Sequence, residues 1–357
     1  MRILVATDAW YPQINGVVRM LTSIAEIARK NDTDFVFITP EHFRHVSLPT
    51  YPDIHAAFPL PAEVEKEILE AEADAVHIAT EGPVGLMVRR FCVQQGLPFT
   101  TSFHTKFPEY VSARLPIPKS WIWAYLRWFH SASGGVMTAT PALRSQLMAH
   151  GIHNTVPWPP AVDAELFQPS HAVSLKVPRP IFLTVSRLAV EKNIEAFLAL
   201  DLPGSKVVVG DGPARESLVR KFPGAIFVGT KKGKALASFY AAADAFVFPS
   251  LTDTFGLVIL EALASGTPVA AFPVDALIQL PGISQVAALE SDLRAACLRA
   301  VNLSRARCRS FALSYSWQES TRCFLNQLVP VVRTFSRDPE FTGQPAPDLA
   351  KVCGRLL

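Results

Sequence analysis

Two carboxylates in the second half of the chain, Asp253 and Glu261, stand eight residues apart. Asp253 follows an apolar run in a predicted loop, whereas Glu261 lies in a helix-forming stretch. Such a spacing can arise by chance, but a loop carboxylate can also accept hydrogen bonds from sugar hydroxyls and a helix carboxylate from a ribose diol. Backbone N–H groups at the start of that helix could face phosphates. They belong to Phe255, Gly256, Leu257 and Val258.

Two cations, Arg187 and Lys192, stand five residues apart just after the apolar run 181–185. Arginine offers a planar fork of donors and lysine a point charge, so the pair could hold both phosphates of a diphosphate and stabilise it as a leaving group. A solvent-exposed turn with an Arg–Glu pair is the alternative interpretation. If the cations hold the diphosphate, they replace a metal, and we expect none.

Two glycine-containing turns lie between a predicted strand and a predicted helix. Gly16 precedes the helix 17–30, and Gly210 follows the strand 206–209. Glycine lets the backbone come close to a ligand, and the helix N-terminus behind it offers unpaired N–H groups to an anion. A purely structural role is the alternative at Gly16. The second turn lacks the spacing of a dinucleotide-binding or P-loop motif, although it could still face a ligand.

Short apolar runs alternate with helix-length segments from end to end, as in parallel sheets covered on both faces. The predicted strands are 3–7, 34–39, 75–78, 98–102 and 135–139, then 181–185, 206–209, 226–228, 245–249 and 268–271. The predicted helices are 17–30, 215–221, 235–243 and 257–264. We therefore predict an α/β protein with two doubly wound domains and a cleft between them, for which 357 residues are a suitable length.

Prolines crowd between the two halves, from Pro157 to Pro180, and we place the interdomain linker there. The predicted divisions are a first domain at 1–165, a second at 178–312, a C-terminal helix at 313–330 that returns to the first domain, and a loose tail at 338–357.

The composition excludes several classes of protein. Hydrophobic residues make up 49% of the chain and charged residues 18%, a balance typical of globular domains. Five scattered cysteines form no CxxC pair, so they indicate neither a disulfide framework nor a zinc site. The first apolar run meets Asp8 at once, too soon for a signal peptide, and we expect a cytoplasmic protein. The net charge is only +3, and we expect no nucleic-acid partner.

In chain order, five segments resemble the retaining glycosyltransferases of the large family numbered four, which have the GT-B fold. They are NGVVR, SFHTKFPEY, SRLAVEKN, VVVGDGP and TDTFGLVILEALASGTPV. The resemblance implies that Gly16 lies beside the donor diphosphate, that Arg187 and Lys192 hold it, and that His104 contacts the transferred sugar.

Asp253 and Glu261 match the E-x7-E motif of that family. The resemblance implies that Glu261 binds the ribose and that Asp253 contacts the sugar, although aspartate is shorter than glutamate by one methylene. It also implies retention of configuration by a front-face mechanism, in which the leaving phosphate helps to deprotonate the acceptor. Two departures from the family pattern, at Pro159-Pro160 and Asp275-Ala276, fall near the expected cleft and could narrow the choice of donor or mark a weakened enzyme.

Within that family the chain is most similar to bacterial enzymes that glycosylate diacylglycerol or other membrane lipids. We therefore expect a hexose or uronic acid to pass from a UDP-sugar, with no further cofactor, to a lipid hydroxyl. A GDP-mannose donor, an epimerase or phosphorylase of similar architecture, and a relative that binds nucleotide sugars or membranes without turnover remain alternatives.

The segment 118–130 combines aromatic and cationic side chains. It lies in a basic part of the chain, because residues 82–150 contain seven lysines and arginines against one acid. A helix with this composition can lie at a bilayer interface, and an ordinary core-facing helix is the alternative. The predicted contacts with a lipid acceptor at the inner membrane surface are Lys119, Trp121, Trp123 and Arg127.

Overall fold

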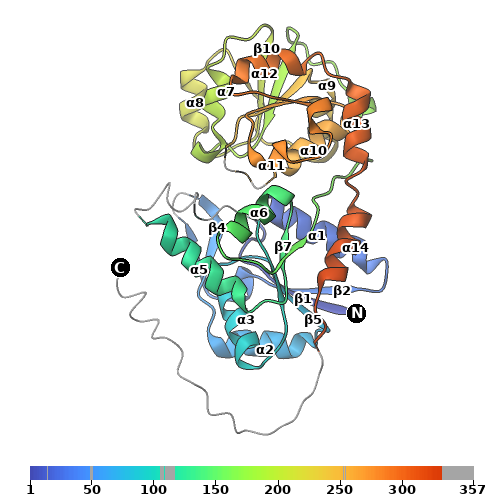
Figure 1. Ribbon diagram of the computed structural model, residues 1–357. Coiled ribbons are helices and arrows are strands. Elements are labelled where there is room, and N and C mark those ends of the chain that lie inside the picture. The colour runs from blue at the N-terminus through green and yellow to red at the C-terminus, as the bar shows by residue number, and fades with distance from the viewer. Residues whose placement is uncertain are drawn as a thin grey trace.

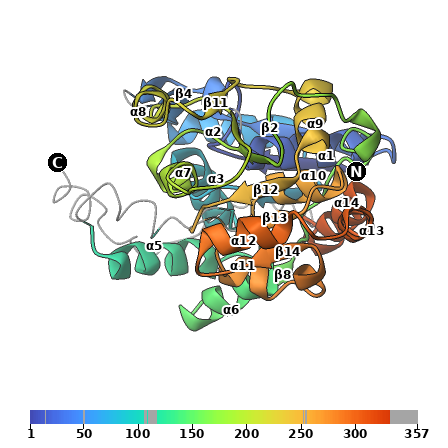
Figure 2. The same ribbon diagram turned by 90° about the horizontal axis from the view of Figure 1, so that it is seen from above.

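A computed structural model describes residues 1–331, except residues 14, 49–50, 105–107, 109–116, 252 and 254. Two domains stack one above the other, each a parallel sheet with helices on its faces (Figure 1). The helices α13 (Arg305–Leu313) and α14 (Trp317–Gln327) run down one side, and they also lie together in the view from above (Figure 2). The tail predicted at 338–357 lies outside the described residues.

The first domain has a six-stranded parallel sheet in the order β2-β1-β5-β6-β7-β8. Its strands are β1 (Arg2–Ala6), β2 (Asp34–Ile38), β5 (Ala75–Ile78), β6 (Thr100–Ser102), β7 (Val136–Thr138) and β8 (Thr155–Pro157). The five strands predicted for this half are confirmed, each with ends within two residues. The strand β8 was missed because it is short and ends on a proline, which an edge strand tolerates.

Helices α1 (Gly16–Arg29), α2 (Pro61–Ala71), α3 (Pro83–Gln94), α5 (Lys119–Ser131) and α6 (Pro141–Ala149) belong to this domain. The first begins where the Asn15 side chain accepts a hydrogen bond from the Val18 N–H at 3.0 Å, which satisfies one of the free donors of a helix start. Its buried Leu21 and Ile24 pack with Val5 of β1. Burying an aliphatic side chain of this size contributes about 1.5–3 kcal/mol.

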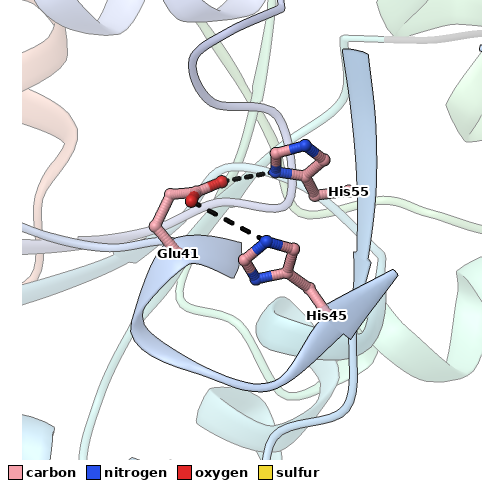
Figure 3. Close-up of side chains that lie close together, drawn as sticks. All are labelled: Glu41, His45 and His55. Carbon is pink, nitrogen blue, oxygen red and sulfur yellow. Dashed lines mark hydrogen bonds and ion pairs between the residues drawn. The ribbon is translucent and has the colours of Figure 1, made fainter. Parts of the chain in front are cut away.

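An antiparallel hairpin interrupts the alternation of the first domain. A short 3-10 helix, η1 (Pro40–His42), precedes the strands β3 (His45–Leu48) and β4 (Tyr51–Ala57), which pair outside the main sheet (Figure 3). This hairpin was not predicted, because its polar and proline-containing sequence lacks the alternation of apolar residues that marks a strand buried on one face.

The second domain has a six-stranded parallel sheet in the order β11-β10-β9-β12-β13-β14. Its strands are β9 (Ile181–Val185), β10 (Ser205–Val209), β11 (Ile226–Phe227), β12 (Ala245–Phe248), β13 (Val269–Ala271) and β14 (Ala287–Leu289). Its helices include α7 (Ile194–Leu198), α8 (Arg215–Lys221), α9 (Gly233–Ala242), α10 (Leu257–Ala264), α11 (Asp275–Ile278) and α12 (Leu293–Ala300). All five strands and all three helices predicted here are confirmed, and β14 was missed.

The chain crosses between the domains twice. Val162 forms a bridge with Ser316 where the outgoing and returning segments run side by side. Beyond it, Phe324 of α14 is buried with β1 and α1, and its ring lies 5.9 Å from that of Phe35 in β2. The last helix therefore packs on the first domain.

Candidate functional site

The strand order of the second sheet reverses between β9 and β12, so the carboxyl ends of these two strands form the switch point of the sheet. Ligands of open α/β sheets bind at such a switch point. Two contacts hold the loops after these strands together: the Asn193 side-chain amide donates to the Pro249 carbonyl at 3.1 Å, and the Ser250 hydroxyl donates to the Glu191 carbonyl at 3.4 Å. The predicted cations and the first carboxylate lie on these loops.

Lys192 and Asp253 meet at this switch point. The Lys192 Nζ lies 2.6 Å from Asp253 Oδ1, and both side chains are about three-quarters buried. The other oxygen, Asp253 Oδ2, is buried and accepts no hydrogen bond from the described residues. A buried acceptor of this kind is costly unless a donor reaches it, and a sugar hydroxyl is a donor of suitable size. Arg187 lies two residues beyond β9 and is half-buried.

The start of α10 lies at the same edge of the sheet. Gly256 precedes it with φ of 89°, and a Cβ there would come 2.9 Å from the Phe248 ring, so the turn requires glycine. Leu257 and Val258 in the first turn are half-buried. Phe255 is 4% exposed, and its side chain belongs to the core. The predicted contact of Phe255 with the nucleotide-sugar is therefore limited to its backbone.

The structure gives Gly210 a packing role. Its φ is 137°, and a Cβ there would come 1.9 Å from the Ser186 carbonyl oxygen. The turn that follows Gly210 is also hydrogen-bonded to the loop that carries Arg187, because the Leu188 N–H donates to the Asp211 carbonyl at 2.8 Å. Close approach of two backbones therefore accounts for the glycine without a ligand.

Gly16 of the first domain reaches the second domain. A Cβ at Gly16 would lie 3.7 Å from Leu257 Cδ1, an ordinary van der Waals separation, and no backbone strain requires glycine here. The N-terminus of α1 in the first domain and that of α10 in the second therefore lie next to each other. Two helix N-termini that meet in this way both favour an anion.

Glu261 is 2% exposed and forms an ion pair with Arg19 of α1, so this pair links the two domains. Its second oxygen, Oε2, is buried with no donor of the described residues within hydrogen-bond distance, and the Tyr240 hydroxyl, also without a partner at that distance, is a nearby donor. Burial and the Glu261 carboxylate raise the pKa of the neighbouring Tyr240, whose hydroxyl stays protonated. Arg19 was not among the predicted site residues, although it is the last residue of the NGVVR segment and lies one helical turn from Gly16.

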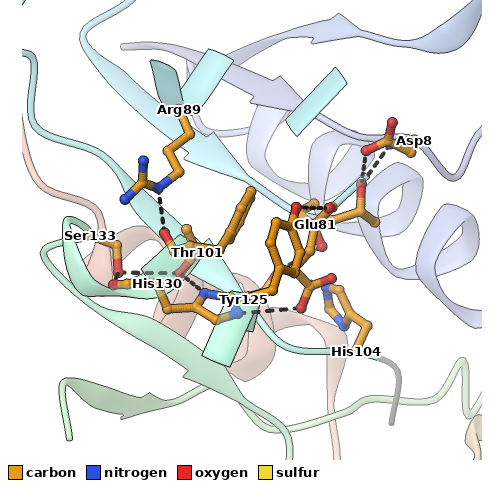
Figure 4. Close-up of polar contacts among 12 residues, drawn as sticks. Asp8, Glu81, Arg89, Thr101, His104, Tyr125, His130 and Ser133 are labelled. Atoms are coloured by element: carbon orange, nitrogen blue, oxygen red, sulfur yellow. Dashed lines mark hydrogen bonds and ion pairs between the residues drawn. The ribbon is translucent and has the colours of Figure 1, made fainter. Parts of the chain in front are cut away.

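His104 lies two residues after the end of β6, among polar side chains of the first domain (Figure 4). Its Nε2 is 2.8 Å from the Ser102 hydroxyl, which is 3.1 Å from Nε2 of His77. Burial lowers the pKa of His104 to about 4, so its imidazole is neutral near pH 7. A neutral imidazole can hydrogen-bond a sugar hydroxyl without bringing a charge. The following residues of the SFHTKFPEY segment lie largely outside the described part of the chain.

The switch point of the first sheet, between β1 and β5, holds a carboxylate that sequence reasoning missed. Asp8 accepts hydrogen bonds from the N–H of Val84 at 2.7 Å, the N–H of Gly85 at 3.3 Å and the Thr80 hydroxyl at 2.8 Å. It therefore caps the start of α3 from a distance. Burial raises the pKa of Asp8 to about 6 despite these donors.

The helix α5 presents one face to solvent. Trp121 is 65% exposed, and Lys119 and Arg127 are exposed on the same helix. Trp123 is 5% exposed, because its ring stacks on His150 with centroids 3.7 Å apart, so the prediction that it contacts a membrane is wrong. At helical spacing, residues 121 and 123 point to different sides. In the described part of the chain no helix has the length and apolar character needed to cross a bilayer.

The two departures from the family pattern differ in their surroundings. The Pro159 carbonyl accepts a hydrogen bond from the Ser320 hydroxyl at 2.7 Å, and the adjacent Trp158 ring lies 5.4 Å from His104 in an edge-on arrangement. This proline segment thus supports a predicted site residue. Asp275 begins the short helix α11 and is exposed, whereas Ala276 is buried.

Family models match both halves of the chain. One described as Glycosyltransferase Family 4 matches residues 14–166, and one described as Glycosyl transferases group 1 matches residues 179–301. The boundary between the two matches falls in the proline-rich segment that joins the sheets.

Named relatives align with most of the chain. A GDP-mannose-dependent alpha-mannosyltransferase of Mycobacterium tuberculosis is 30% identical over 297 residues, with 76% of this chain and 79% of the relative covered. The sulfoquinovosyl transferase of Arabidopsis thaliana is also 30% identical over 297 residues. That alignment covers 73% of this chain but only 57% of the length of the relative. The alpha-monoglucosyldiacylglycerol synthase of Streptococcus pneumoniae is 26% identical over 348 residues, with 84% and 78% covered.

Solved structures show the same architecture. Sucrose-phosphate synthase from Thermosynechococcus elongatus superposes with a TM-score of 0.71 at 18% identity. The superposition covers 91% of this chain and 97% of the synthase chain. HepE of Anabaena, solved with UDP and glucose, gives 0.67 at 14% identity, covering 91% and 98%. Two doubly wound domains that carry the family's motifs in order, and a relative 30% identical over most of both chains, establish that this chain belongs to glycosyltransferase family 4 and has the GT-B fold.

Proposed function

We propose that this glycosyltransferase moves a hexose or uronic acid from a UDP-sugar to a hydroxyl of a membrane lipid, diacylglycerol being the acceptor we favour. The observation that carries the donor half is the pair Lys192 and Asp253, a cation and a carboxylate with one open acceptor at the β9–β12 switch point. Arg187 and Lys192 hold the diphosphate together with the N–H groups at the start of α10.

The remaining donor contacts follow from this placement. A sugar hydroxyl donates to Asp253 Oδ2, and a ribose hydroxyl donates to Glu261 Oε2 while Arg19 stays on the other oxygen. His104 contacts the transferred sugar from the first domain as a neutral imidazole. Gly16 leaves room for the diphosphate beside the N-terminus of α1.

The transfer step breaks the bond between the anomeric carbon and the phosphate oxygen and forms a bond to the acceptor oxygen on the same face. The acceptor proton goes to the leaving diphosphate, whose charge Arg187 and Lys192 stabilise. The step needs no glycosidase-type carboxylate pair, and we propose that it needs no metal ion, because the two cations neutralise the leaving group.

Two observations support the lipid acceptor. The Streptococcus pneumoniae relative is named as a synthase of alpha-monoglucosyldiacylglycerol. The exposed face of α5 offers Trp121 with Lys119 and Arg127, a combination suited to peripheral binding at an anionic membrane surface. This binding would bring a cytoplasmic enzyme to its acceptor.

A GDP-mannose donor is the second candidate, and the Mycobacterium tuberculosis relative, which is named for it, favours that candidate. A catalytically weakened relative is the third, because Asp253 is shorter than the glutamate of the family motif and because the proline segment lies beside His104.

A donor and acceptor panel tests the proposal. The full chain is incubated with UDP-glucose, UDP-galactose, UDP-glucuronate or GDP-mannose and with vesicles that contain diacylglycerol, and lipids are analysed by mass spectrometry. We expect a glycosyldiacylglycerol from a UDP-sugar, in EDTA as well as in Mg²⁺. A mannolipid formed with GDP-mannose alone would show that GDP-mannose, not a UDP-sugar, is the donor. Loss of turnover in EDTA that Mg²⁺ or Mn²⁺ restores would overturn the metal-free step. No product from any donor and acceptor pair would favour the catalytically weakened relative.

A further inference from the structure

The β3–β4 hairpin places two imidazoles side by side. His45 pairs directly with Ala57, so His55, two residues earlier on β4, is its diagonal neighbour on the same face of the hairpin. Their rings stack with centroids 4.5 Å apart and planes only 12° from parallel. Neither histidine has a part in the donor or acceptor contacts described above.

A carboxylate faces both rings. Glu41 comes from η1, four residues before His45, and Figure 3 shows its carboxylate directed at the two imidazoles. His55 Nδ1 lies 2.5 Å from Glu41 Oε1, and His45 Nε2 lies 3.9 Å from Glu41 Oε2. One ligand atom from each of the three residues lies within 4.8 Å of the other two. Three potential metal ligands therefore converge from three separate elements.

The hydrogen bond on the far side of His45 fixes which of its nitrogens can bind a cation. Its Nδ1 lies 3.0 Å from the Phe43 carbonyl oxygen. Because a carbonyl only accepts, Nδ1 carries the proton, and in the neutral ring Nε2 presents a lone pair to the Glu41 carboxylate. A proton or a metal ion between these two acceptors would be held by both of them. A histidine whose other nitrogen donates to a backbone carbonyl is also the usual arrangement of a metal-ligating histidine.

We propose that Glu41, His45 and His55 bind a divalent transition metal of the zinc class, with water in the fourth position. Imidazole nitrogens suit Zn²⁺, Co²⁺ and Ni²⁺, whereas Mg²⁺ and Ca²⁺ require oxygen ligands. Tetrahedral zinc with bonds of about 2.0–2.1 Å sets its ligand atoms roughly 3.4 Å apart, which small side-chain rotations reach from the observed separations. His55 gives up its Nδ1 proton when the metal binds.

The site would tie the hairpin to the segment that enters it. Glu41 precedes β3 while His55 lies on β4, so a bound ion closes a loop of fifteen residues in the first domain. The side chains are partly accessible, with 43% of Glu41, 28% of His45 and 17% of His55 exposed, which leaves an entry path for the ion. This proposal concerns hairpin stability and is independent of the metal-free transfer step.

Calorimetric titration with ZnCl₂ tests the site on the full untagged chain after EDTA treatment and removal of the chelator. A Cys323→Ser, Cys353→Ser background removes competing thiolates. We expect about one Zn²⁺ per chain and a raised melting temperature. The variants His45→Ala and His55→Ala should bind Zn²⁺ at least about tenfold more weakly and lose the thermal shift. His42→Ala is the matched control, because this imidazole pairs with Glu67 at 3.0 Å and is not a ligand.

Cobalt absorption gives a second readout that does not depend on stability. CoCl₂ should produce visible d–d bands with the parent and with His42→Ala, and not with His55→Ala or Glu41→Gln. Circular dichroism without metal must match for all variants, and a variant that fails this test is replaced by its glutamine counterpart. Zinc binding equal in the parent, His45→Ala and His55→Ala, or no zinc binding by the parent, would overturn the proposal.

Discussion

The two domains place an aspartate at the same point of their sheets, where the strand order reverses, and use it differently. In the first domain Asp8 after β1 bonds to Thr80 after β5 and to two N–H groups of α3. In the second domain Asp253 after β12 pairs with Lys192 after β9 and keeps Oδ2 open. An aspartate at a switch point is thus available to a ligand only where its oxygens are not already satisfied by the protein.

The largest expected effect is the loss of turnover when Asp253, which keeps one oxygen without a hydrogen bond, is replaced. Asp253→Ala should lower kcat/KM by about 10²–10³-fold, because a sugar hydroxyl and Lys192 lose their partner at the reacting end of the donor. Asp253→Glu, which restores the family's residue, should retain most of the activity. Initial rates with labelled donor measure this, and Asp211→Ala, an exposed aspartate after β10, is the matched control. A loss in Asp211→Ala as large as in Asp253→Ala would contradict the assignment.

The link between the domains should affect donor affinity. Glu261→Ala should weaken donor binding by about 1–3 kcal/mol, the scale for losing a charged hydrogen-bond partner. Glu261→Gln keeps the size of this buried side chain and separates lost contact from lost packing. Calorimetry with the nucleotide-sugar provides the dissociation constant, and a value unchanged in both variants would remove Glu261 from the site.

Asp8, whose oxygens already accept hydrogen bonds from the protein, should matter for folding and not for binding of the nucleotide-sugar. Asp8→Ala should lower the free energy of unfolding by about 1–2 kcal/mol, as for a lost helix cap, with donor affinity intact. Burial raises the pKa of Asp8 from 3.8 to about 6, so the folded protein holds a proton that the unfolded chain releases in that window. Stability contributed by this group therefore falls as pH rises from about 4 to 6.

Urea unfolding at several pH values measures this contribution. The Asp8→Asn variant should lack the part of the pH slope that belongs to Asp8. An identical slope in parent and variant, or a donor affinity that falls in Asp8→Ala, would show that Asp8 is not the purely structural residue described here.

The smallest expected effect concerns the acceptor side. Trp121→Ala should reduce flotation with anionic vesicles and leave UDP-sugar affinity unchanged, and added salt should reduce flotation further, since each cation near such a surface contributes about 1 kcal/mol. Leu313→Ala, which removes a 52% exposed apolar side chain from α13, is the control. Equal flotation of Trp121→Ala and parent would make α5 an ordinary surface helix.

Most of the fold could be predicted because parallel strands are continuous apolar runs, and β5 and β9 matched their predicted limits. The β3–β4 hairpin could not, since its polar, proline-containing sequence does not alternate apolar and polar residues. In the site, the motifs singled out Lys192 and Asp253, and the structure places their side chains 2.6 Å apart, a contact that the motifs did not predict. The motifs did not reveal the ion pair of Arg19 with Glu261 or the hydrogen bonds of Asp8 with the start of α3, because these contacts depend on how distant elements pack. Trp123 was assigned to the surface by composition, and only helical phase reveals that it is buried.

Calorimetry with UDP, which lacks the sugar, tests the central claim most directly. If Lys192 holds the diphosphate and Asp253 the sugar, Lys192→Ala should weaken UDP binding by about tenfold or more, as expected for a lost charged contact, whereas Asp253→Asn should not weaken it. Both variants should bind UDP-sugar less tightly than the parent. UDP affinity unchanged in Lys192→Ala, or lowered equally in Asp253→Asn, would contradict the account of this switch point.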